Sequence, residues 1–569
     1  MRKPAVIDIF CGAGGFSEGF RQQGFDIKLG IDHWEPAIKT FNHNFGLNSS
    51  VKNVLDFEHS VDEIEALPDT EVIIGSPPCV TFSSSNISGK ADKTSGITLT
   101  QIFLRIVAVK KWKNGSKLEA WFMENVPSSI KHLGNEYTFE ELGLGDWAAK
   151  NKIGRSKVAI KLAGNQQIIN SADYGSPQSR ERVISGEIIK RKKLIIPQAL
   201  NTKDISIDPT LKSWITLKQV KGHLPKPNCT KSYRKVSDPN YPWVEINLNN
   251  LTDHFYDTGL FECEWRQSKF LKTNHPYMGK MSFPENEDRP SRTITATKIG
   301  TSREAIIYKS EYRRIGNGQY RTPTVREAAC IMGFPITYQF IGSEGTKWRL
   351  VGNAVCPSVA KAFAKQLRKE LGWNEIRKPL VQLDPDLILN NDLNSFSAKK
   401  LKAPPKRNTG SRFRRHPFKD GNITVTLSNY DIEQNGKDVN KWITSVQYGN
   451  GEGFPTFDFP DNLHQKLEQL IKNCKKGNRF IEVINNGFSE KIAKGNTLQK
   501  MYELQRSAED YLEPTKLIER VAAIIDDLKI DEEQFTQNGT VVFKQKDSVP
   551  LKQLFALYAI NKITFIANR

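Results

Sequence analysis

Cys79 is the residue of this sequence best placed to act as a nucleophile. It ends the run Gly75-Ser-Pro-Pro-Cys79, which follows directly on the apolar residues Val72 to Ile74. Two prolines restrict the backbone there, and open α/β folds place their reacting groups at the carboxyl ends of sheet strands. Most cysteines are inert, small hydrophobic residues of a core, but the rigid turn after a glycine argues against burial here. We therefore expect Cys79 to present a thiol that reacts as a thiolate.

One acidic and two basic residues are candidates for the same edge of the sheet. Glu124 ends the hydrophobic run in Trp121-Phe-Met-Glu124-Asn-Val-Pro127, where an acid in apolar surroundings can share a proton with a ring nitrogen. Arg180 and Arg182 occupy alternate positions of Gln178-Ser-Arg180-Glu-Arg182-Val183, so both side chains can face one site. The alternatives are a surface glutamate at a strand end and arginines that bind phosphate or form salt bridges.

A glycine-rich turn and a later carboxylate are typical of a nucleotide-binding sheet. Val6-Ile-Asp-Ile-Phe10 runs straight into Cys11-Gly-Ala-Gly-Gly15, so we expect a buried strand to turn into a helix whose amide groups can hold an anion. Such turns also occur as plain packing corners. Asp32 closes the next strand, about twenty residues on, where a carboxylate can accept both ribose hydroxyls of an adenosine cofactor.

The pattern from Val6 to about Ile188 predicts the elements that position these residues. Short apolar runs alternate with longer amphipathic stretches, which indicates a parallel α/β sheet covered by helices. Helices are expected over Phe16 to Gln23 and over Leu99 to Trp112. The predicted strands are Val6 to Phe10, Asp26 to Ile31, Glu71 to Ile74 and Ala120 to Met123.

Composition and charge indicate a globular protein with a polyanionic partner. Of the 569 residues 38% are hydrophobic and 25% charged, and the formal charge of +19 favours nucleic acid. The seven cysteines are scattered without the spacing of a zinc site, so we expect reduced thiols and no metal. We see no apolar run long enough for a bilayer, and Ala5 to Phe10 is too short for a signal peptide, which predicts a cytoplasmic protein.

Taken together and in this order, these motifs resemble those of the DNA cytosine-5 methyltransferase family, in its bacterial restriction-modification form. Two later segments, Arg289-Pro-Ser-Arg-Thr-Ile-Thr-Ala-Thr297 and Leu350-Val-Gly352-Asn353-Ala-Val355, also resemble family motifs. Thr324-Val-Arg-Glu327 and Gly333-Phe-Pro335 resemble the segment that precedes the second of these motifs in the family. The resemblance implies a Rossmann-like α/β sheet that uses S-adenosylmethionine, with a smaller target-recognition domain.

The same resemblance implies residues for the cofactor, whose product is S-adenosylhomocysteine. Phe10 would lie against the adenine ring, flanked by His33, and Asp32 would bind the ribose. The glycine turn would hold the methionine part. Carried over position by position, the cofactor-binding residues are Phe10, Gly12, Ala13, Gly15, Asp32, His33, Pro78 and Asn353.

The resemblance also implies how a cytosine would be methylated. The thiolate of Cys79 would add to C6, because C5 alone is too poor a nucleophile to take a methyl group. Glu124 would hydrogen-bond N3 and the exocyclic amine, while Arg182 would hold O2 and favour the thiolate. Arg180 would support the site.

The base must leave the stacked duplex before this chemistry is possible. The segment from Ser83 to Gly96 has the small, flexible composition of a lid loop, and its alternative is a surface linker. By resemblance it closes over DNA, with Ser85 or Asn86 entering the vacated stack and Lys90 or Lys93 near phosphates.

Three positions depart from the family pattern. Val80 stands where the family usually has glutamine, and Cys356 where proline usually follows the Asn353 motif. Near Asn53-Val54 there is no acid for the adenine. Cofactor affinity is the property on which these departures bear.

The chain is predicted to divide into a cofactor-binding catalytic domain (1–188), a target-recognition domain (189–323), a return to the catalytic domain (324–375), a basic linker (376–421) and an α+β accessory domain (422–569). In the last, helices are expected at Asp461 to Cys474 and Pro514 to Leu528, and strands at Ile423 to Leu427 and Phe480 to Ile484. A DNA-grasping module and a purely structural appendage are both compatible with it.

Double-stranded DNA is the expected partner, with a cognate restriction endonuclease that makes no direct contact and no membrane. Two other functions remain open. The first is a transfer-RNA methyltransferase, although the Cys-Phe-Thr motif of that branch is not found here. The second is a non-catalytic DNA-binding homologue, which the intact Cys79, Glu124 and Arg182 disfavour.

Overall fold

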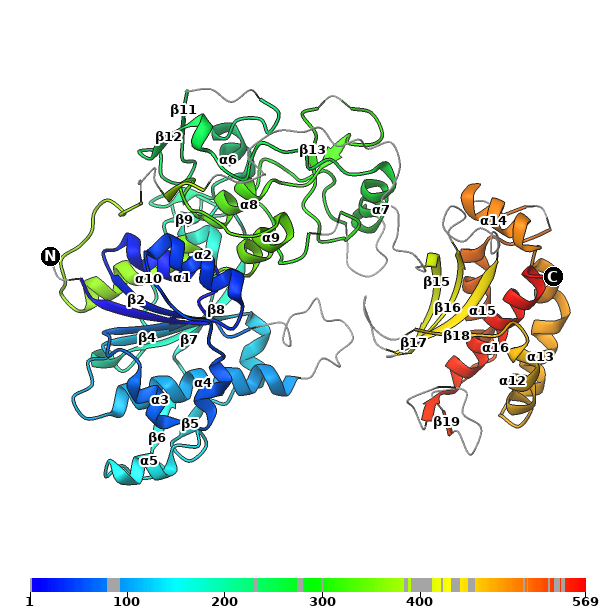
Figure 1. Cartoon of the computed structure of the whole chain (residues 1–569), viewed down its shortest axis with the longest axis horizontal. Helices are drawn as coiled ribbons and strands as arrows, with labels where there is room; N and C mark the ends of the chain where they lie inside the picture. The colour runs from blue at the N-terminus through cyan, green and yellow to red at the C-terminus, as the bar shows by residue number, and fades with distance from the viewer. Residues whose placement is uncertain are drawn as a thin grey trace. The chain divides into compact units, whose positions relative to one another are not determined.

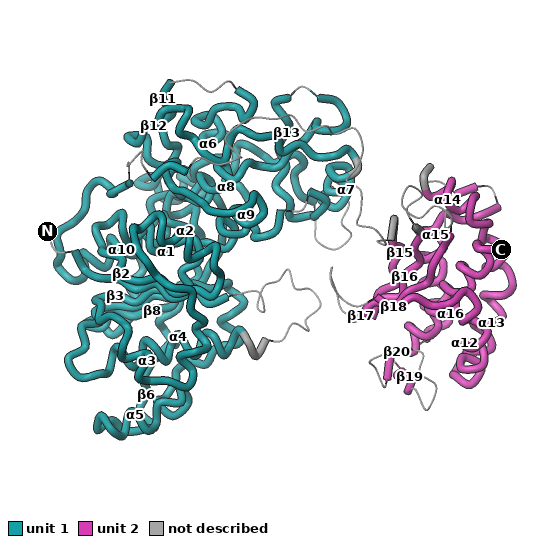
Figure 2. Tube along the Cα trace, viewed as in Figure 1, with its two compact units in different colours: residues 1–404 teal, residues 405–569 magenta. Residues whose placement is uncertain are grey.

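The chain forms two compact units, residues 1–404 and 405–569, each with a hydrophobic core of its own (Figures 1 and 2). The division precedes the predicted start of the accessory domain at residue 422, because β15 (Arg412–Asp420) is a strand of the second unit's sheet. This computed structural model describes residues 3–78, 93–229, 234–273, 280–298, 300–312, 314–382, 387–389, 412–420, 423–430, 441–448, 456–504, 507–508, 510–530, 533–536, 543 and 548–569.

A six-stranded mixed sheet is the centre of the first unit. Its order is β2-β1-β3-β4-β8-β7, and the first four of these strands are parallel. The four predicted strands are confirmed, but the expectation of a wholly parallel sheet is wrong at one edge. There β8 runs antiparallel to both of its neighbours, β4 and β7. The short connection between β7 and β8 suits an antiparallel pair. The strands are β1 (Ala5–Ile9), β2 (Asp26–Ile31), β3 (Val72–Gly75), β4 (Ala120–Asn125), β7 (Gln166–Asn170) and β8 (Glu181–Ile188).

Helices cover both faces of this sheet, which is why its central strands are almost continuously apolar (Figure 1). Ile74 and Phe122 belong to the core beneath α1 and α10, whereas Ile73 and Trp121 belong to the core that contains α4. Both predicted helices are confirmed as α1 and α4. The elements of this layer are α1 (Gly15–Gln22), α2 (Glu35–Phe45), α3 (Val61–Ala66), α4 (Lys93–Trp112), α5 (Gly145–Lys150) and the pair β5 (Glu136–Thr138) and β6 (Val158–Lys161).

The chain returns to this core through α8 (Val325–Met332), α9 (Glu344–Asn353) and α10 (Pro357–Glu370). Glycine lets α10 pack closely on α1: a Cβ on Gly19 would lie 2.4 Å from the Cβ of Ala360. The start of α8 is fixed by a capping box between Thr324 and Glu327.

The smaller region that precedes α8 consists of short elements joined by long connections. It is held to α8 by a buried ion pair, in which Nη1 of Arg321 lies 2.7 Å from Oε2 of Glu327. Its elements are β9 (Asn201–Thr202), β10 (Lys212–Ser213), α6 (Leu217–His223), β11 (Lys235–Ser237), β12 (Glu245–Asn247), α7 (Glu262–Thr273), β13 (Tyr308–Lys309) and β14 (Tyr320–Arg321).

The second unit packs its helices against a four-stranded antiparallel sheet, order β15-β16-β17-β18. The apolar helix α16 lies against β16 and β17 and is buried on nearly every side. The predicted strand at Phe480 to Ile484 is wrong: these residues lie in and just after α13, where Phe480 and Ile484 are one helical turn apart and both buried. The remaining elements are β16 (Ile423–Tyr430), β17 (Trp442–Tyr448), β18 (Thr456–Phe459), α12 (Leu463–Lys472), α13 (Gly477–Val483), α14 (Gly495–Leu504), α15 (Pro514–Asp527), β19 (Gln534–Thr536), β20 (Ser548–Pro550) and α16 (Leu551–Ala567).

Among the described residues, no helix has the length and apolar character that a membrane crossing requires.

Candidate active site

The turn between β1 and α1 has a backbone that glycine adopts most readily. Gly12 and Gly14 have φ values of +51° and +84°, and Phe10 adopts +61° in spite of its side chain. A Cβ on Gly12 would meet no described atom within 4 Å, whereas a Cβ on Gly15 would lie 2.2 Å from the carbonyl oxygen of Val355. The turn is therefore open at Gly12 and pressed at Gly15 against the segment after α9.

Asp32, at the end of β2, is tethered to this turn. Its Oδ2 accepts a hydrogen bond from the backbone N–H of Gly12 at 3.0 Å, and its Oδ1 accepts one from Trp34 at 2.9 Å. The ring of His33 is 70% exposed, with Nδ1 3.5 Å from Oδ1 of Asp32. The structure thus brings together Phe10, Gly12, Asp32 and His33 at one edge of the sheet.

Asp8, which the sequence analysis did not single out, lies behind the same turn. Its side chain is buried, and its Oδ2 accepts a hydrogen bond from Oγ of Ser17 at 2.7 Å. Its Oδ1 has no hydrogen-bond partner among the residues that the structure describes. Burial, together with the negative charge of Asp32, raises the pKa of Asp8 to about 8. An acid in the middle of the strand Val6 to Phe10 was the signal that could have identified it.

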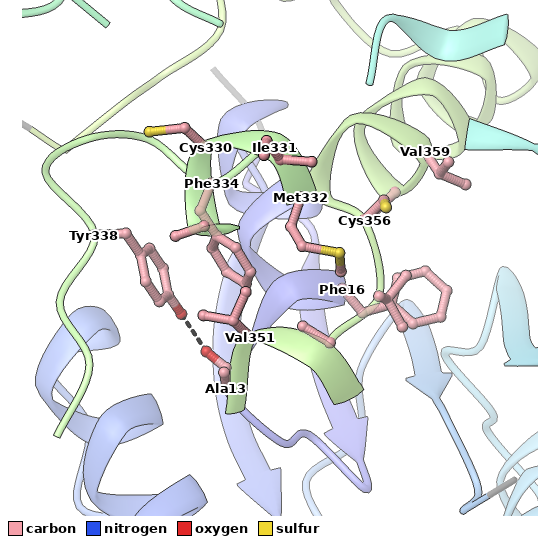
Figure 3. Packing of buried hydrophobic residues seen from close by; sticks show 14 of the residues in the cluster. Ala13, Phe16, Cys330, Ile331, Met332, Phe334, Tyr338, Val351, Cys356 and Val359 are labelled. Atoms are coloured by element: carbon pink, nitrogen blue, oxygen red, sulfur yellow. Dashed lines mark hydrogen bonds between the residues drawn. The ribbon is translucent and has the colours of Figure 1, made fainter. Parts of the chain in front are cut away.

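Ala13, in the middle of the turn, is held in place by Tyr338. The hydroxyl of Tyr338 donates a hydrogen bond to the carbonyl oxygen of Ala13, and Phe334 and Val351 pack around this contact (Figure 3). Both residues of the hydrogen bond are buried. Tyr338 follows the Gly333-Phe-Pro335 motif closely but is itself outside any motif, so the sequence offered no signal for its role.

Glu124 and Arg182 meet at the carboxyl end of β4. In the antiparallel pair of β4 and β8, Glu124 lies opposite Ile184, so Arg182 is its diagonal neighbour on the same face. Nε of Arg182 lies 3.0 Å from Oε1 of Glu124, and the two side chains are 17% and 11% exposed. The predicted acid and arginine therefore form one ion pair that is mostly buried but keeps a small area exposed to solvent.

A small pocket lies beside this pair. Its polar wall contains Glu124, Arg180 and Arg182, and Cys356 and Val359 come to it from the start of α10. Burial raises the pKa of the Cys356 thiol, so this side chain lines the pocket as a neutral thiol. The pocket residues are Glu124, Ile169, Ser171, Arg180, Arg182, Ile184, Val355, Cys356 and Val359.

Arg180 is buried and binds backbone rather than the open pocket. Its Nη1 donates to the carbonyl oxygen of Ile294 at 3.1 Å, and its Nη2 donates to those of Gly352 and Ala354 at 3.3 and 3.4 Å. Arg180 thereby holds the end of α9, where Asn353 is exposed. Its role is to position the Asn353 segment.

Two side chains hold the segment that leads to Cys79. Nδ2 of Asn125 donates to the carbonyl oxygen of Pro77 at 3.4 Å, and Oγ of Ser76 donates to that of Phe10 at 3.1 Å. Pro78 is half-buried and is the last described residue before position 93. These contacts join the glycine turn, the two prolines and the strand that carries Glu124.

Several predicted residues lie outside the described part of the chain. They are Cys79 itself, the departure Val80, and the lid residues Ser85, Asn86 and Lys90. Lys93 begins α4, and its side chain is outside the description as well. At the third departure, Asn53 is exposed and caps the following turn, with Oδ1 accepting from the N–H of Leu55 at 3.1 Å.

Comparison with known proteins gives a consistent result for the first unit. The family model for C-5 cytosine-specific DNA methylases matches residues 5–369. The Type II methyltransferase M.MthTI of Methanothermobacter thermautotrophicus is 27% identical over 379 residues, which cover 64% of this chain and 97% of that protein. The Type II methyltransferase M1.HphI of Haemophilus parahaemolyticus is 26% identical over 380 residues, covering 64% and 86%. The solved methyltransferase EhMeth of Entamoeba histolytica superimposes with a TM-score of 0.38 at 20% identity, over 65% of this chain and 99% of that one.

Proposed function

Because the chain belongs to the C-5 cytosine-specific DNA methylase family, we propose that it methylates C5 of a flipped-out cytosine in a specific sequence of duplex DNA, with S-adenosylmethionine as donor. The observation that carries this proposal is the pair of Glu124 and Arg182, 3.0 Å apart at the pocket. Glu124 lies on β4, whose Asn125 holds Pro77, two residues before Cys79.

The residues at the glycine turn fit this cofactor. The open space at Gly12 admits a ligand against the backbone, and the tethered carboxylate of Asp32 can accept ribose hydroxyls. When bound, the cofactor supplies an electrophilic methyl group. The hydrogen bond from Gly12 to Asp32 keeps the glycine turn and the ribose-binding carboxylate in a fixed relative position.

The chemistry at the base follows from three side chains. When a cytosine has been swung out of the duplex beside Glu124 and Arg182, Glu124 hydrogen-bonds its N3 and exocyclic amine, and Arg182 holds its O2. The thiolate of Cys79 adds to C6, and the electron pair of the C5–C6 double bond becomes available at C5. After C5 has accepted the methyl group, it loses its proton to a base and the C6–S bond breaks, which restores the aromatic ring and the thiolate.

We further propose that methylation protects cellular DNA in a restriction-modification system, with a cognate endonuclease that recognises the same sequence. The relatives M.MthTI and M1.HphI carry the name of Type II methyltransferases, which supports this role. The endonuclease needs no contact with this chain, because the methyl group on the DNA is the signal.

Covalent trapping tests the proposed mechanism. Duplex DNA with 5-fluorocytosine at the target should form a denaturation-resistant adduct with the wild-type protein and cofactor, because a fluorine at C5 cannot leave as a proton. The Cys79→Ala variant should form none. Bisulfite sequencing of DNA from cells that express the protein identifies the target first. Methyl incorporation into transfer RNA but not duplex DNA would contradict the choice of substrate, and a wild-type protein that binds target DNA without forming the adduct would contradict the mechanism.

A further inference from the structure

The segment that follows α10 docks on the catalytic domain. Its described residues 374–382 and 387–389, here called the strap, lie beyond residues 5–369, which the family model matches. The backbone N–H of Leu380 donates to the carbonyl oxygen of Gln22, the last residue of α1, at 2.9 Å. The strap is therefore an added element of the first unit that holds the carboxyl end of α1.

Apolar side chains seat the strap beside this hydrogen bond. Ile376 is buried, and a Cβ on Gly24 would lie 3.3 Å from its Cδ1. Val381 packs against the hydrophobic core of the first unit. Just before the strap, the ring centroids of Trp373 and Phe25 are 6.0 Å apart. Burial as well as hydrogen bonding therefore fixes the strap on α1.

Arg21 connects the strap to α2. Its guanidinium donates to Oε1 of Gln382 in the strap and, at 2.7 Å, to the carbonyl oxygen of Asn44 near the end of α2. The same group lies 4.9 Å from the centroid of the Phe45 ring. Phe45 in turn packs on the glycine turn, where a Cβ on Gly14 would lie 2.6 Å from its ring. One arginine thus joins the strap, both helices and, through Phe45, the turn.

The strap reaches α2 a second time, farther along the chain. Nε2 of His43 donates to the carbonyl oxygen of Leu387 at 2.6 Å. The backbone N–H of Leu389 donates to Oε1 of Gln339 at 3.2 Å. Gln339 is itself bound to α2, because its backbone N–H donates to Oδ1 of Asn44 at 3.0 Å. The strap therefore spans the carboxyl ends of both α1 and α2.

We propose that the strap positions the two corners that bind the cofactor, with Arg21 and Gln382 as positioning residues. The inference rests on the proposed function, since the ligand is S-adenosylmethionine or its product. Helix α1 begins at the glycine turn, and α2 begins at Glu35, just after Asp32. Two helices that are held together at their carboxyl ends keep Gly12 and Asp32 in one arrangement. The cofactor then does not have to order these corners as it binds, which would lower its affinity.

Variants of Gln382 test this role through binding of S-adenosylhomocysteine, measured by isothermal titration calorimetry. Gln382→Ala should weaken binding about threefold or more, because Arg21 loses a hydrogen bond that ties it to the strap. Gln382→Glu offers Arg21 a carboxylate oxygen and should keep the wild-type affinity. The control is Gln366→Ala on α10, where the lost hydrogen bond is to Glu370; this variant should also bind as the wild type does.

A second pair of variants tests the backbone contact. Leu380→Pro removes the N–H that donates to Gln22 and should weaken binding by a similar factor. Leu380→Ala keeps this N–H, and the side chain that it shortens is 52% exposed, so its affinity should equal that of the wild type. In assays of methyl transfer, Gln382→Ala and Leu380→Pro should raise KM for S-adenosylmethionine and leave kcat unchanged, because neither residue is placed at the reacting atoms.

Thermal unfolding separates positioning of the cofactor site from packing alone. The rise in Tm that S-adenosylhomocysteine produces should be smaller in Gln382→Ala and Leu380→Pro than in the wild type. Wild-type affinity in both variants, whether or not their Tm is lowered, would overturn this inference alone, because the strap would then serve only the stability of the fold. A wild-type protein that binds no S-adenosylhomocysteine would overturn the proposed function, and this inference with it.

Discussion

Nε of Arg182 lies 3.0 Å from Oε1 of Glu124, so each of these two charged side chains depends on the other as its counter-ion. Removal of either partner leaves the other as a shielded charge without its counter-ion. Effects of the two residues on activity are for that reason not additive.

Glu124→Gln should lower the rate of methyl transfer by about 10²–10³-fold, because an amide cannot share a proton with N3 in the same way. Incorporation of labelled methyl groups into target DNA measures the rate. The exposed neighbour Glu181 provides the control Glu181→Gln, which should retain the wild-type rate. Full activity of Glu124→Gln would remove this residue from the chemistry.

Asp32→Ala should weaken binding of S-adenosylhomocysteine by roughly tenfold or more, because it removes a charged acceptor and the two hydrogen bonds that tether Gly12 and Trp34. Isothermal titration calorimetry provides the measurement. Glu35→Gln, at an exposed position three residues later, should bind as the wild type does. Equal affinity of both variants would show that the ribose is held elsewhere.

Gly19→Ala should destabilise the first unit by about 1–3 kcal/mol, because the added Cβ would lie 2.4 Å from that of Ala360. Thermal unfolding gives the shift in Tm. Gly222→Ala, in α6 and with no described atom within 4 Å of the added Cβ, should be neutral or stabilise by about 0.5–1 kcal/mol. A Tm of Gly19→Ala at or above the wild-type value would mean that α1 and α10 can separate without cost.

The buried carboxyl of Asp8 makes stability fall as the pH rises. Its pKa is raised to about 8 in the folded chain, so between about pH 4 and 8 the folded state binds a proton that the unfolded state releases. The stabilising effect of that proton is complete below about pH 4 and is lost as the pH approaches 8. Asp8→Asn keeps an acceptor for Ser17 and should be more stable than the wild type at pH 8, by a few kcal/mol. Thermal unfolding between pH 5 and 9 should show a flatter curve for the variant; parallel curves would contradict the prediction.

Deletion of residues 405–569 should leave the first unit folded, because the cores of the two units share no residue. If the second unit grasps DNA, the deletion weakens DNA binding and flattens its salt dependence. Fluorescence anisotropy at several salt concentrations measures both. A preserved salt slope would leave the second unit a structural appendage.

Much of the first unit could be predicted from sequence because periodicity and turn residues report local structure. The strands at Val6 and Ala120 and the helix at Leu99 are local patterns. The roles that the family motifs imply for Asp32, Glu124 and Arg182 stay predictions. The antiparallel direction of β8 was missed, because an apolar strand looks the same in either direction. Tyr338 was missed because its contact with Ala13 depends on tertiary packing over more than three hundred positions.

The second unit was harder to predict because it lies beyond residues 5–369, which the family model matches, so composition and periodicity alone were left. The run Phe480 to Ile484 is apolar enough for a strand, and only its packing in the core beside α16 makes it helical. The basic residues from Arg412 onward suggested a linker by composition, yet they pair with β16 as an edge strand. Alternation of exposed charge with buried Phe418 was the signal for a strand.

The contact of α10 with α1 has a consequence for the order in which the protein matures. Gly15 and Gly19 pack against Val355 and Ala360, which leave the ribosome hundreds of positions later. In a nascent chain the glycine turn therefore lacks this packing until α10 has been made. The region between β8 and α8 is an insertion in the catalytic domain, whose first and last helices, α1 and α10, pack on each other. An exchange of this region for another sequence must keep its buried charges, because Arg321 pairs with Glu327 and Asp253 pairs with Lys347.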